Sequence, residues 1–212
     1  TLEGRDGAGL SLALCVQGRL AAGRSPWAKG PLILGDALLL SRPLGSGVLL
    51  AAAMAGGAAD PLWIDGLLQA LQQSQAPLVE LLLAHGCHAC TDITGFGLLG
   101  HLGEMLAAGA GVRLSLDGAA IPAWPGALEL LAAGHASSLA PANARSLALL
   151  EGPVRLCGAG DGLDAARRAL LLDPQTCGPL LAALPSERAD AAVEALRQAG
   201  FEQAAVIGLV EV

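Results

Sequence analysis

Short apolar runs of strand length alternate along this chain with segments of helical periodicity, and glycine or proline closes most of them. Strands are expected at residues 9–16, 32–40, 88–93, 112–116, 180–184 and 204–212. Helices are expected at residues 67–83, 98–108, 127–133, 142–150 and 164–172, and between Ser186 and Gly200. Strands that alternate with helices in this way are typical of layered folds and not of a helical bundle or a β-sandwich. The sequence therefore predicts an α+β fold with mixed α/β layers.

Three local signals predict where helices begin and end. Pro43 is expected in the first turn of a helix, where its missing N–H costs nothing. Pro77 either kinks the helix over 67–83 or begins a second helix. Ser186 is expected to cap the last helix, and Gly200 is expected to end it.

The composition favours a folded core and argues against a membrane span. Hydrophobic residues make up 53% of the 212 residues, and the mean hydropathy is +0.56. The longest uncharged stretch, 43–59, is rich in alanine and glycine, so it is too weakly apolar to match a span of about 20 strongly apolar residues. The first residues lack the basic and apolar regions of a signal peptide. Five cysteines without framework spacing indicate reduced thiols. We therefore expect a cytoplasmic protein, seen here as a fragment, with no membrane partner.

The charge balance argues against nucleic acid as a partner. Twelve Lys and Arg residues stand against nineteen Asp and Glu residues, which gives a net charge of -7, and Lys29 is the single lysine. Neutralisation of a phosphate backbone needs a clustered basic surface, which these scattered arginines do not supply. Acidic small molecules could still bind through metal ions.

The segment from Ala89 to His101 has the strongest chemical pattern in the chain. Asp92 is expected at the end of a strand, beside Gly95 and Gly97 and before a helix. A carboxylate can hold Mg²⁺ at such a point, while backbone amides at the helix N-terminus hold phosphate oxygens. Alternatively, Asp92 caps a turn and the two glycines serve a tight bend. The pattern alone leaves both interpretations open.

A second pattern, Cys87-x-x-Cys90 with His85 and His88 interleaved and His101 nearby, suggests zinc ligands. Structural zinc sites normally use two separated ligand pairs, and no second cysteine pair exists in this chain. Cys90 also falls in the expected strand, where a free cysteine is usually a small buried apolar residue. Zinc is therefore the less favoured interpretation.

Residues 91–101, which read Thr-Asp-Ile-Thr-Gly-Phe-Gly-Leu-Leu-Gly-His, resemble the signature of the selenophosphate synthetases, the selenide, water dikinases. Three further features are similar in the same chain order. Residues 42–49 resemble the opening of the family's C-terminal domain, Asn143 follows the Ile121-Pro122 segment, and residues 173–181 resemble the family's Asp-Pro-Gln-Thr loop. The chain thus resembles the C-terminal portion of these enzymes, within the superfamily of aminoimidazole ribonucleotide synthetase-like ATP-dependent enzymes.

This resemblance implies a division into two parts. Residues 1–31 are expected to be a remnant, the last strand and linker, of an N-terminal ATP-binding and dimerisation domain. Residues 32–212 are expected to form the C-terminal α/β domain of the aminoimidazole ribonucleotide synthetase-like type. In the family, the part that precedes Thr1 supplies a catalytic Cys or selenocysteine and a catalytic Lys. No catalytic residue is therefore assigned in this fragment, which we expect to be inactive alone.

The resemblance also implies ligands and site residues. The family makes selenophosphate, AMP and phosphate from selenide, ATP and water, so ATP and selenide are the expected partners of the parent protein, with Mg²⁺ as the ion and a homodimer as the assembly. Asp92 is carried over as a metal ligand. The positions expected to face phosphate or nucleotide are Thr91, Thr94, Gly95, Gly97 and Asn143.

Cys177 and Pro179 depart from the family, which has serine and glycine at these positions, and the departures leave the role of that loop open. Two other functions also remain open, namely another ATP-dependent enzyme of the same superfamily and a non-catalytic metal-binding or interaction module. The sequence upstream of Thr1 would separate them, since a Cys or selenocysteine followed closely by Lys in a glycine-rich segment would favour the dikinase.

Overall fold

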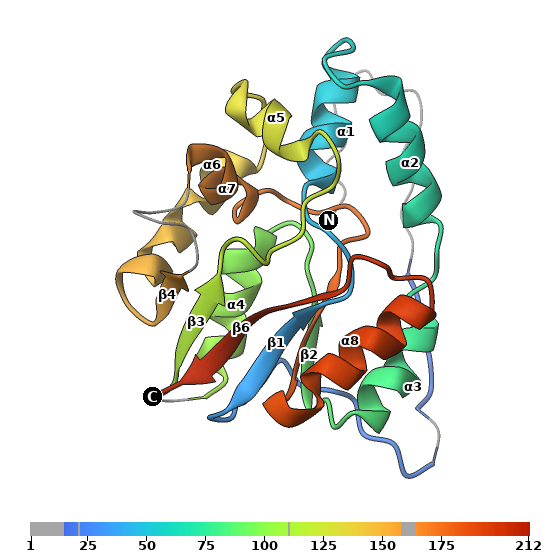
Figure 1. Cartoon of the computed structure of the whole chain (residues 1–212), viewed down its shortest axis with the longest axis vertical. Coiled ribbons are helices and arrows are strands. Elements are labelled where there is room, and N and C mark those ends of the chain that lie inside the picture. The colour runs from blue at the N-terminus through green and yellow to red at the C-terminus, as the bar shows by residue number, and fades with distance from the viewer. Residues whose placement is uncertain (1–14, 21, 110, 158–163) are drawn as a thin grey trace.

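A six-stranded sheet forms the centre of the protein, with strand order β2-β5-β1-β6-β3-β4 (Figure 1). A computed structural model describes residues 15–20, 22–109, 111–157 and 164–212. Strands β3 and β4 are parallel, and every other neighbouring pair in the sheet is antiparallel. The strands are β1 (Asp36–Leu40), β2 (Ala89–Asp92), β3 (Arg113–Asp117), β4 (Val154–Cys157), β5 (Leu180–Pro185) and β6 (Ala205–Glu211).

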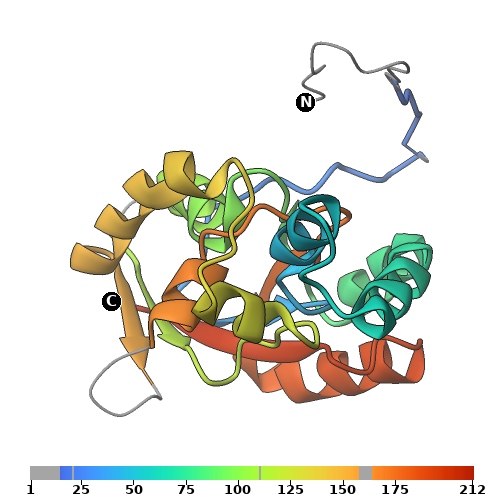
Figure 2. The ribbon, with the colours of Figure 1, turned by 90° about the horizontal axis from the view of Figure 1, so that it is seen from above.

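Helices cover both faces of this sheet. The α-helices are α1 (Ser46–Met54), α2 (Pro61–Leu71), α3 (Ala76–Ala84), α4 (Gly97–Ala107), α5 (Ala127–Ala132), α6 (Ala140–Asn143), α7 (Ala165–Leu170) and α8 (Ala189–Gln198), and the 3₁₀ helices are η1 (Ala144–Glu151) and η2 (Ser186–Arg188). Apolar residues of α1, α4, α5 and α7 pack on one face, and those of α3 and α8 pack on the other. Figure 2 shows α4 and α8 on opposite sides of the sheet. The predicted α+β fold with mixed layers is confirmed.

Strand β1 shows why the central strands are apolar throughout. Leu38 and Leu40 belong to the core on one face, while Ala37 and Leu39 belong to the core on the other. All four are at most 1% exposed, because β1 lies between β5 and β6 with helices on both sides. A strand covered on both faces carries continuous apolar residues in place of an alternating pattern.

Most expected elements are present, with boundaries shifted by local turns. The expected strand at 32–40 begins only at Asp36, because Gly35, at φ 87°, lies in a turn. That turn is closed by the Asp36 amide, which donates to the Ile33 carbonyl at 3.0 Å, and by the Ile33 amide, which donates to the Asp36 carboxylate at 2.8 Å. Pro77 occupies the first turn of α3, so it begins a second helix and does not kink a longer one.

Two predicted helix starts are wrong. Pro43 precedes α1, because the Leu44 amide donates to the Pro122 carbonyl at 2.9 Å and keeps this segment extended until Gly45. Ser186 does not cap α8 with its side chain; it begins the 3₁₀ turn η2, and α8 starts at Ala189.

The remaining differences concern three segments. The expected helix at 142–150 is divided between the short α6 and the 3₁₀ helix η1. Strand β4 was not predicted. Most of the expected strand at 9–16 lies outside the described residues, and the two described positions, Cys15 and Val16, are exposed and belong to no strand.

Within the described ranges, no helix combines the length and the apolar character that crossing a bilayer requires. The longest helices, α2 and α4, have 11 residues each.

Candidate functional site

Asp92 is the last residue of β2, and its side chain is exposed. The strand places it by pairing with β5, where Asp92 lies opposite Leu180. Its carboxylate accepts no hydrogen bond from any residue in the described part of the chain. An open carboxylate of this kind is a hard oxygen ligand, which suits Mg²⁺.

The loop after Asp92 is fixed through the peptide groups of Thr94. The Thr94 amide donates to Nε2 of His101 at 3.0 Å. The Thr94 carbonyl accepts from the amides of Gln175, at 2.9 Å, and Gly97, at 3.2 Å. Two segments that resemble the family, 91–101 and 173–181, therefore meet at this residue.

Asn143 joins the same network from α6. It is 5% exposed, and its side-chain nitrogen donates to the carbonyls of Gly95 and Leu172, both at 2.9 Å. These bonds tie the loop after Asp92 to the segment that follows α7. The structure thus brings Asn143 beside the expected site, where its side chain holds backbone; that it faces phosphate stays a prediction.

Gly95 and Gly97 differ in whether a side chain would fit at their positions. Gly97 has φ 67°, and a Cβ there would lie 2.8 Å from the Leu172 carbonyl carbon, so this position accepts no side chain without strain. Gly95 is half-buried, and a Cβ there would meet only the Leu139 side chain, at 3.9 Å. The positive φ and the close packing therefore explain why glycine stands at position 97. At position 95 there is room for a side chain, and the glycine leaves this space beside the backbone open.

Thr91 is buried in β2, 6% exposed, and its hydroxyl donates to the Asp92 carbonyl at 3.3 Å. Of the expected site residues, Thr94, Gly95, Gly97 and Asn143 thus share one hydrogen-bonded network beyond Asp92. Thr91 lies one residue before that network, within the strand.

The sequence pattern did not predict that residues 173–181 contact the N-terminus of α1. The Gln175 side-chain oxygen accepts from the amides of Gly45, at 2.9 Å, and Ser46, at 3.2 Å, and from the Ser46 hydroxyl at 3.1 Å. The Asp173 carboxylate accepts from the Val48 amide at 3.1 Å. These two side chains satisfy donors that the start of a helix leaves unpaired. The resemblance of both segments to one family was the only signal for this contact.

Asp173 carries a perturbed carboxyl group. It is 1% exposed, and its Oδ1 accepts no hydrogen bond from a described residue. Burial raises the pKa of Asp173 to about 6, although the bonds from Val48 and Gln175 act in the opposite direction.

Cys177, one of the departures from the family, is exposed and has a positive φ of 46°. Its carbonyl accepts from Arg42 at 3.4 Å. Arg42 is 4% exposed, donates to the carbonyls of Gln73, at 3.0 Å, and Ala70, at 3.4 Å, and lies 5.3 Å above the Phe201 ring. Burial lowers the pKa of the Arg42 guanidinium from its ordinary value.

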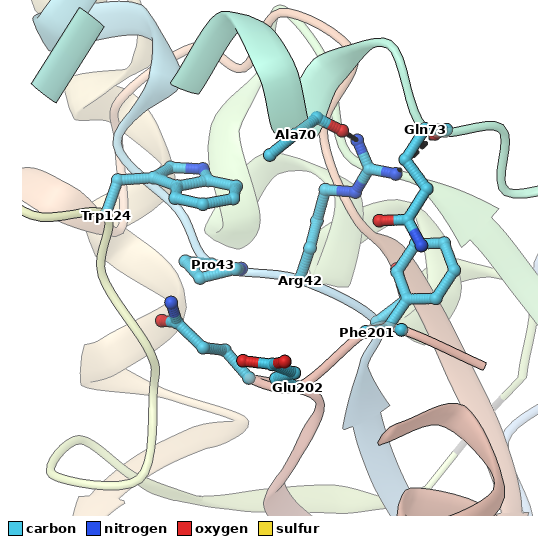
Figure 3. Close-up of a pocket in the computed structure, with 10 residues that line it drawn as sticks. Arg42, Pro43, Ala70, Gln73, Trp124, Phe201 and Glu202 are labelled. Carbon is cyan, nitrogen blue, oxygen red and sulfur yellow. Dashed lines mark hydrogen bonds between the residues drawn. The ribbon is translucent and has the colours of Figure 1, made fainter. Parts of the chain in front are cut away.

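Arg42 also lines a cavity of about 160 Å³ (Figure 3). Figure 3 shows Trp124 across this cavity from the guanidinium, with Glu202 at its lower side. Because the donors of Arg42 are directed at backbone carbonyls at the end of α2, we interpret the residue as a structural cap of that helix. Asp92 is not among the residues that line this cavity.

The side chains of the zinc pattern have other partners. Cys87 and Cys90 are buried in the core beneath α3 and α8. His88 Nε2 lies 2.9 Å from Asp36 Oδ2, and His85 Nδ1 lies 2.8 Å from the Leu81 carbonyl. Within the part of the chain that the structure describes, no three His, Cys, Asp or Glu side chains are grouped so that they could hold a metal ion. Asp92 is therefore one possible ligand and would need further ligands from elsewhere.

Comparisons with known proteins show what this chain is similar to. The selenide, water dikinase of Burkholderia pseudomallei (strain K96243) is 42% identical over 174 residues, which cover 82% of this chain and 47% of that protein. The chain thus spans about half the length of the curated relatives it matches. The resemblance to the C-terminal portion of these enzymes is confirmed.

Solved structures show the same fold. The E. coli hydrogenase maturation protein HypE has a TM-score of 0.55 at 23% identity, covering 88% of this chain and 47% of that one. A structure of HypE in complex with ATP has a TM-score of 0.51 at 22% identity, covering 85% of this chain and 43% of that one. The family described as AIR synthase related protein, C-terminal domain, matches residues 34–212. The chain therefore belongs to the family of AIR synthase related proteins, as a representative of their C-terminal domain.

Proposed function

We propose that this chain is the C-terminal half of a selenide, water dikinase, which makes selenophosphate, AMP and phosphate from selenide, ATP and water. The observation that carries the proposal is the 42% identity to a relative of that name over 82% of the chain. The meeting of residues 91–101 and 173–181 at Thr94 supports it, because the segments that resemble the family are also joined in space.

In this proposal Asp92 is one ligand of a Mg²⁺ ion. Its exposed carboxylate, which accepts no hydrogen bond from a residue that the structure describes, fits that role. A bound divalent ion offsets the charge of the triphosphate and polarises the phosphorus that is transferred. The loop of Thr94, Gly95 and Gly97 lies beside the carboxylate and would face the phosphates, held in place by His101 and Asn143.

The other catalytic parts belong to the rest of the parent protein. Residues 1–31 would be the end of an N-terminal ATP-binding and dimerisation domain, and residues 32–212 the C-terminal domain. That N-terminal domain would supply the nucleophile, the lysine and the further metal ligands. ATP and selenide would be partners of the parent, which we propose to be a cytoplasmic homodimer.

A chimera tests the assignment directly. The N-terminal half of the Burkholderia pseudomallei relative is joined to this chain, and selenide-dependent conversion of ATP to AMP is followed together with selenophosphate by phosphorus NMR. We expect the chimera to be active and the 212-residue chain alone to be inactive, because positioned metals and a nucleophile are needed for phosphoryl transfer.

Two variants of the chimera examine the site. Asp92→Asn keeps the size of the side chain but removes its charge, so turnover should fall by about 100-fold or more while the circular dichroism spectrum is retained. Cys87→Ala, in the core away from Asp92, should change turnover little by comparison. Near-normal activity of the Asn variant, with normal Mg²⁺ dependence, would show that the ligand assignment is wrong.

The chimera also separates the alternatives. A folded chimera that consumes ATP without any dependence on selenide would indicate another ATP-dependent enzyme of the superfamily. A folded chimera that uses no ATP, although the intact relative does, would indicate a non-catalytic module.

A further inference from the structure

His101 is a buried histidine of α4 with a defined tautomer. The residue is 4% exposed, and its Nε2 accepts the hydrogen bond from the Thr94 amide at 3.0 Å. A ring nitrogen that accepts from a backbone N–H carries no proton itself. The proton of the neutral ring therefore lies on Nδ1.

Glu104, one turn further along α4, favours this tautomer. Its Oε2 lies 3.0 Å from His101 Nδ1. The same oxygen accepts from Lys29 Nζ at 2.7 Å, and that bond holds the pKa of Glu104 below its usual value. A charged carboxylate beside Nδ1 stabilises the proton there and leaves the lone pair on Nε2 for Thr94.

The surroundings of the ring favour its neutral form. Burial lowers the pKa of His101, and Lys29 acts in the same direction, while Glu104 and Asp92 act in the opposite direction. The neutral form is the one that can accept from Thr94, so the hydrogen-bond geometry and the electrostatics agree.

We propose that His101 is a positioning residue for the cation-binding and phosphate-binding loop: with its tautomer set by Glu104, it holds the Thr94 amide and thereby fixes the backbone between Asp92 and Gly95. This inference rests on the proposed function, because only that function gives the loop a cation and phosphates to bind. His101 touches no reacting group and acts through Thr94, whose amide lies 3.0 Å and whose hydroxyl lies 3.4 Å from Nε2.

A packing role alone would be a simpler explanation. The His101 ring lies 5.6 Å from the Phe96 ring, centroid to centroid, and fills buried space. Two substitutions distinguish the alternatives. His101→Leu retains an apolar side chain of suitable size without an acceptor, whereas His101→Gln offers an amide oxygen on a flexible side chain that can accept from Thr94.

The first experiment is nitrogen-15 NMR on the labelled chain. We expect His101 to show a protonated Nδ1 and an unprotonated Nε2, with a scalar coupling across the hydrogen bond to the Thr94 amide. Glu104→Gln should shift the ring toward a mixture of tautomers. A protonated Nε2 in the native chain, or the absence of the coupling, would overturn the proposal.

The second experiment measures the loop through amide exchange. Exchange of the Thr94 amide should become about 10-fold faster in His101→Leu and return close to the native rate in His101→Gln. His135→Leu, on a half-buried histidine after α5, is the matched control and should leave the Thr94 amide unchanged. Equal Thr94 protection in the native chain and in a folded His101→Leu variant would contradict the proposal.

The third experiment uses Mn²⁺ alone as a paramagnetic probe of the chimera, labelled in the half that comes from this chain, because Asp92 needs further ligands from the N-terminal half. Broadening near Asp92 should require about 10-fold more Mn²⁺ in His101→Leu, which is the usual size of an outer-shell effect on metal affinity, and His101→Gln should recover most of it. Asp92→Asn should abolish the broadening. If the His101→Leu chimera binds Mn²⁺ like the unsubstituted chimera while the Asp92→Asn chimera does not, the positioning role falls and the metal site stands. If the unsubstituted chimera shows no broadening that depends on Asp92, the proposed metal site falls, and the NMR and exchange results decide the role of His101.

Discussion

Asp173 places a buried carboxylate at the N-terminus of α1. Its replacement by asparagine measures how much the ionisation of this buried group lowers the free energy of unfolding. The carboxylate accepts from the Val48 amide at 3.1 Å and from the Gln175 side chain at 3.1 Å. Asparagine retains an oxygen that can accept from both donors but carries no charge. The substitution thus removes ionisation while the capping contact is largely preserved.

The sign of the effect follows from the two pKa values. The carboxyl pKa rises from 3.8 to about 6 in the folded chain. Because the folded state holds the proton more tightly, the stability from this group is fully present below the unfolded value and is lost as the pH rises through about 6. The loss is about 3 kcal/mol by pH 7, of which about 1.3 kcal/mol falls between pH 5 and pH 7.

Urea unfolding followed by tryptophan fluorescence measures this difference. The free energy of unfolding of Asp173→Asn, minus that of the native chain, should increase by about 1.3 kcal/mol from pH 5 to pH 7. Titratable groups that both proteins share contribute equally to the two free energies of unfolding, so their contributions cancel in this difference. Asp60→Asn, which changes an exposed cap of α2, controls for the removal of a carboxylate as such. Parallel pH profiles for Asp173→Asn and the native chain would refute the reasoning.

Two further predictions concern packing and assembly. Gly97→Ala should lower the free energy of unfolding by about 2 kcal/mol, because of its φ of 67° and the Leu172 backbone, whereas Gly66→Ala, with nothing within 4 Å, should raise it by up to about 1 kcal/mol in the same urea assay. We also expect the chain to form a dimer or larger oligomer through the apolar face that would meet the rest of the proposed parent protein; a clean monomer in sedimentation at high concentration would contradict this.

The parts of the fold that depend on local periodicity could be predicted from the sequence. In α8, Ala189, Val193 and Leu196 recur at helical spacing, and all three are buried. Strand β4 has no such local signal: it has four residues, lies at the edge of the sheet and contains the exposed Arg155. It becomes a strand by pairing with β3, about 40 residues earlier in the chain. Pairing over that distance leaves no trace in the local pattern.

The candidate site also has one part that the local sequence predicts and another part that it does not. Asp92 could be placed from the sequence, because a strand, a glycine-containing turn and a helix follow one another within 91–101. The contacts that hold its loop could not, since Gln175 and Asn143 come from segments about 80 and 50 residues later. Only the resemblance to a family connected these segments before their geometry was known.

The N-terminus of α1 resembles an anion-binding turn, but its own chain occupies it. Gly45, Ser46 and Gly47 open α1 in a glycine-rich turn, which is a common arrangement for binding phosphate. Here the amides of Gly45 and Ser46 are bound to Gln175, and a Cβ on Gly47 would lie 1.9 Å from the Pro174 carbonyl oxygen, so the chain itself fills the turn.

In the loop before α4, by contrast, backbone amides are left without a partner among the described residues. The amides of Gly95 and Phe96 make no hydrogen bond within the described part of the chain, and Phe96 is 51% exposed. These free donors lie three and four residues after the open carboxylate of Asp92. An anion brought by a cation at Asp92 would therefore meet unpaired amides at the start of α4, whereas at α1 it would have to displace Gln175. This difference supports the proposal that the loop after Asp92, and not the glycine-rich start of α1, receives the phosphates.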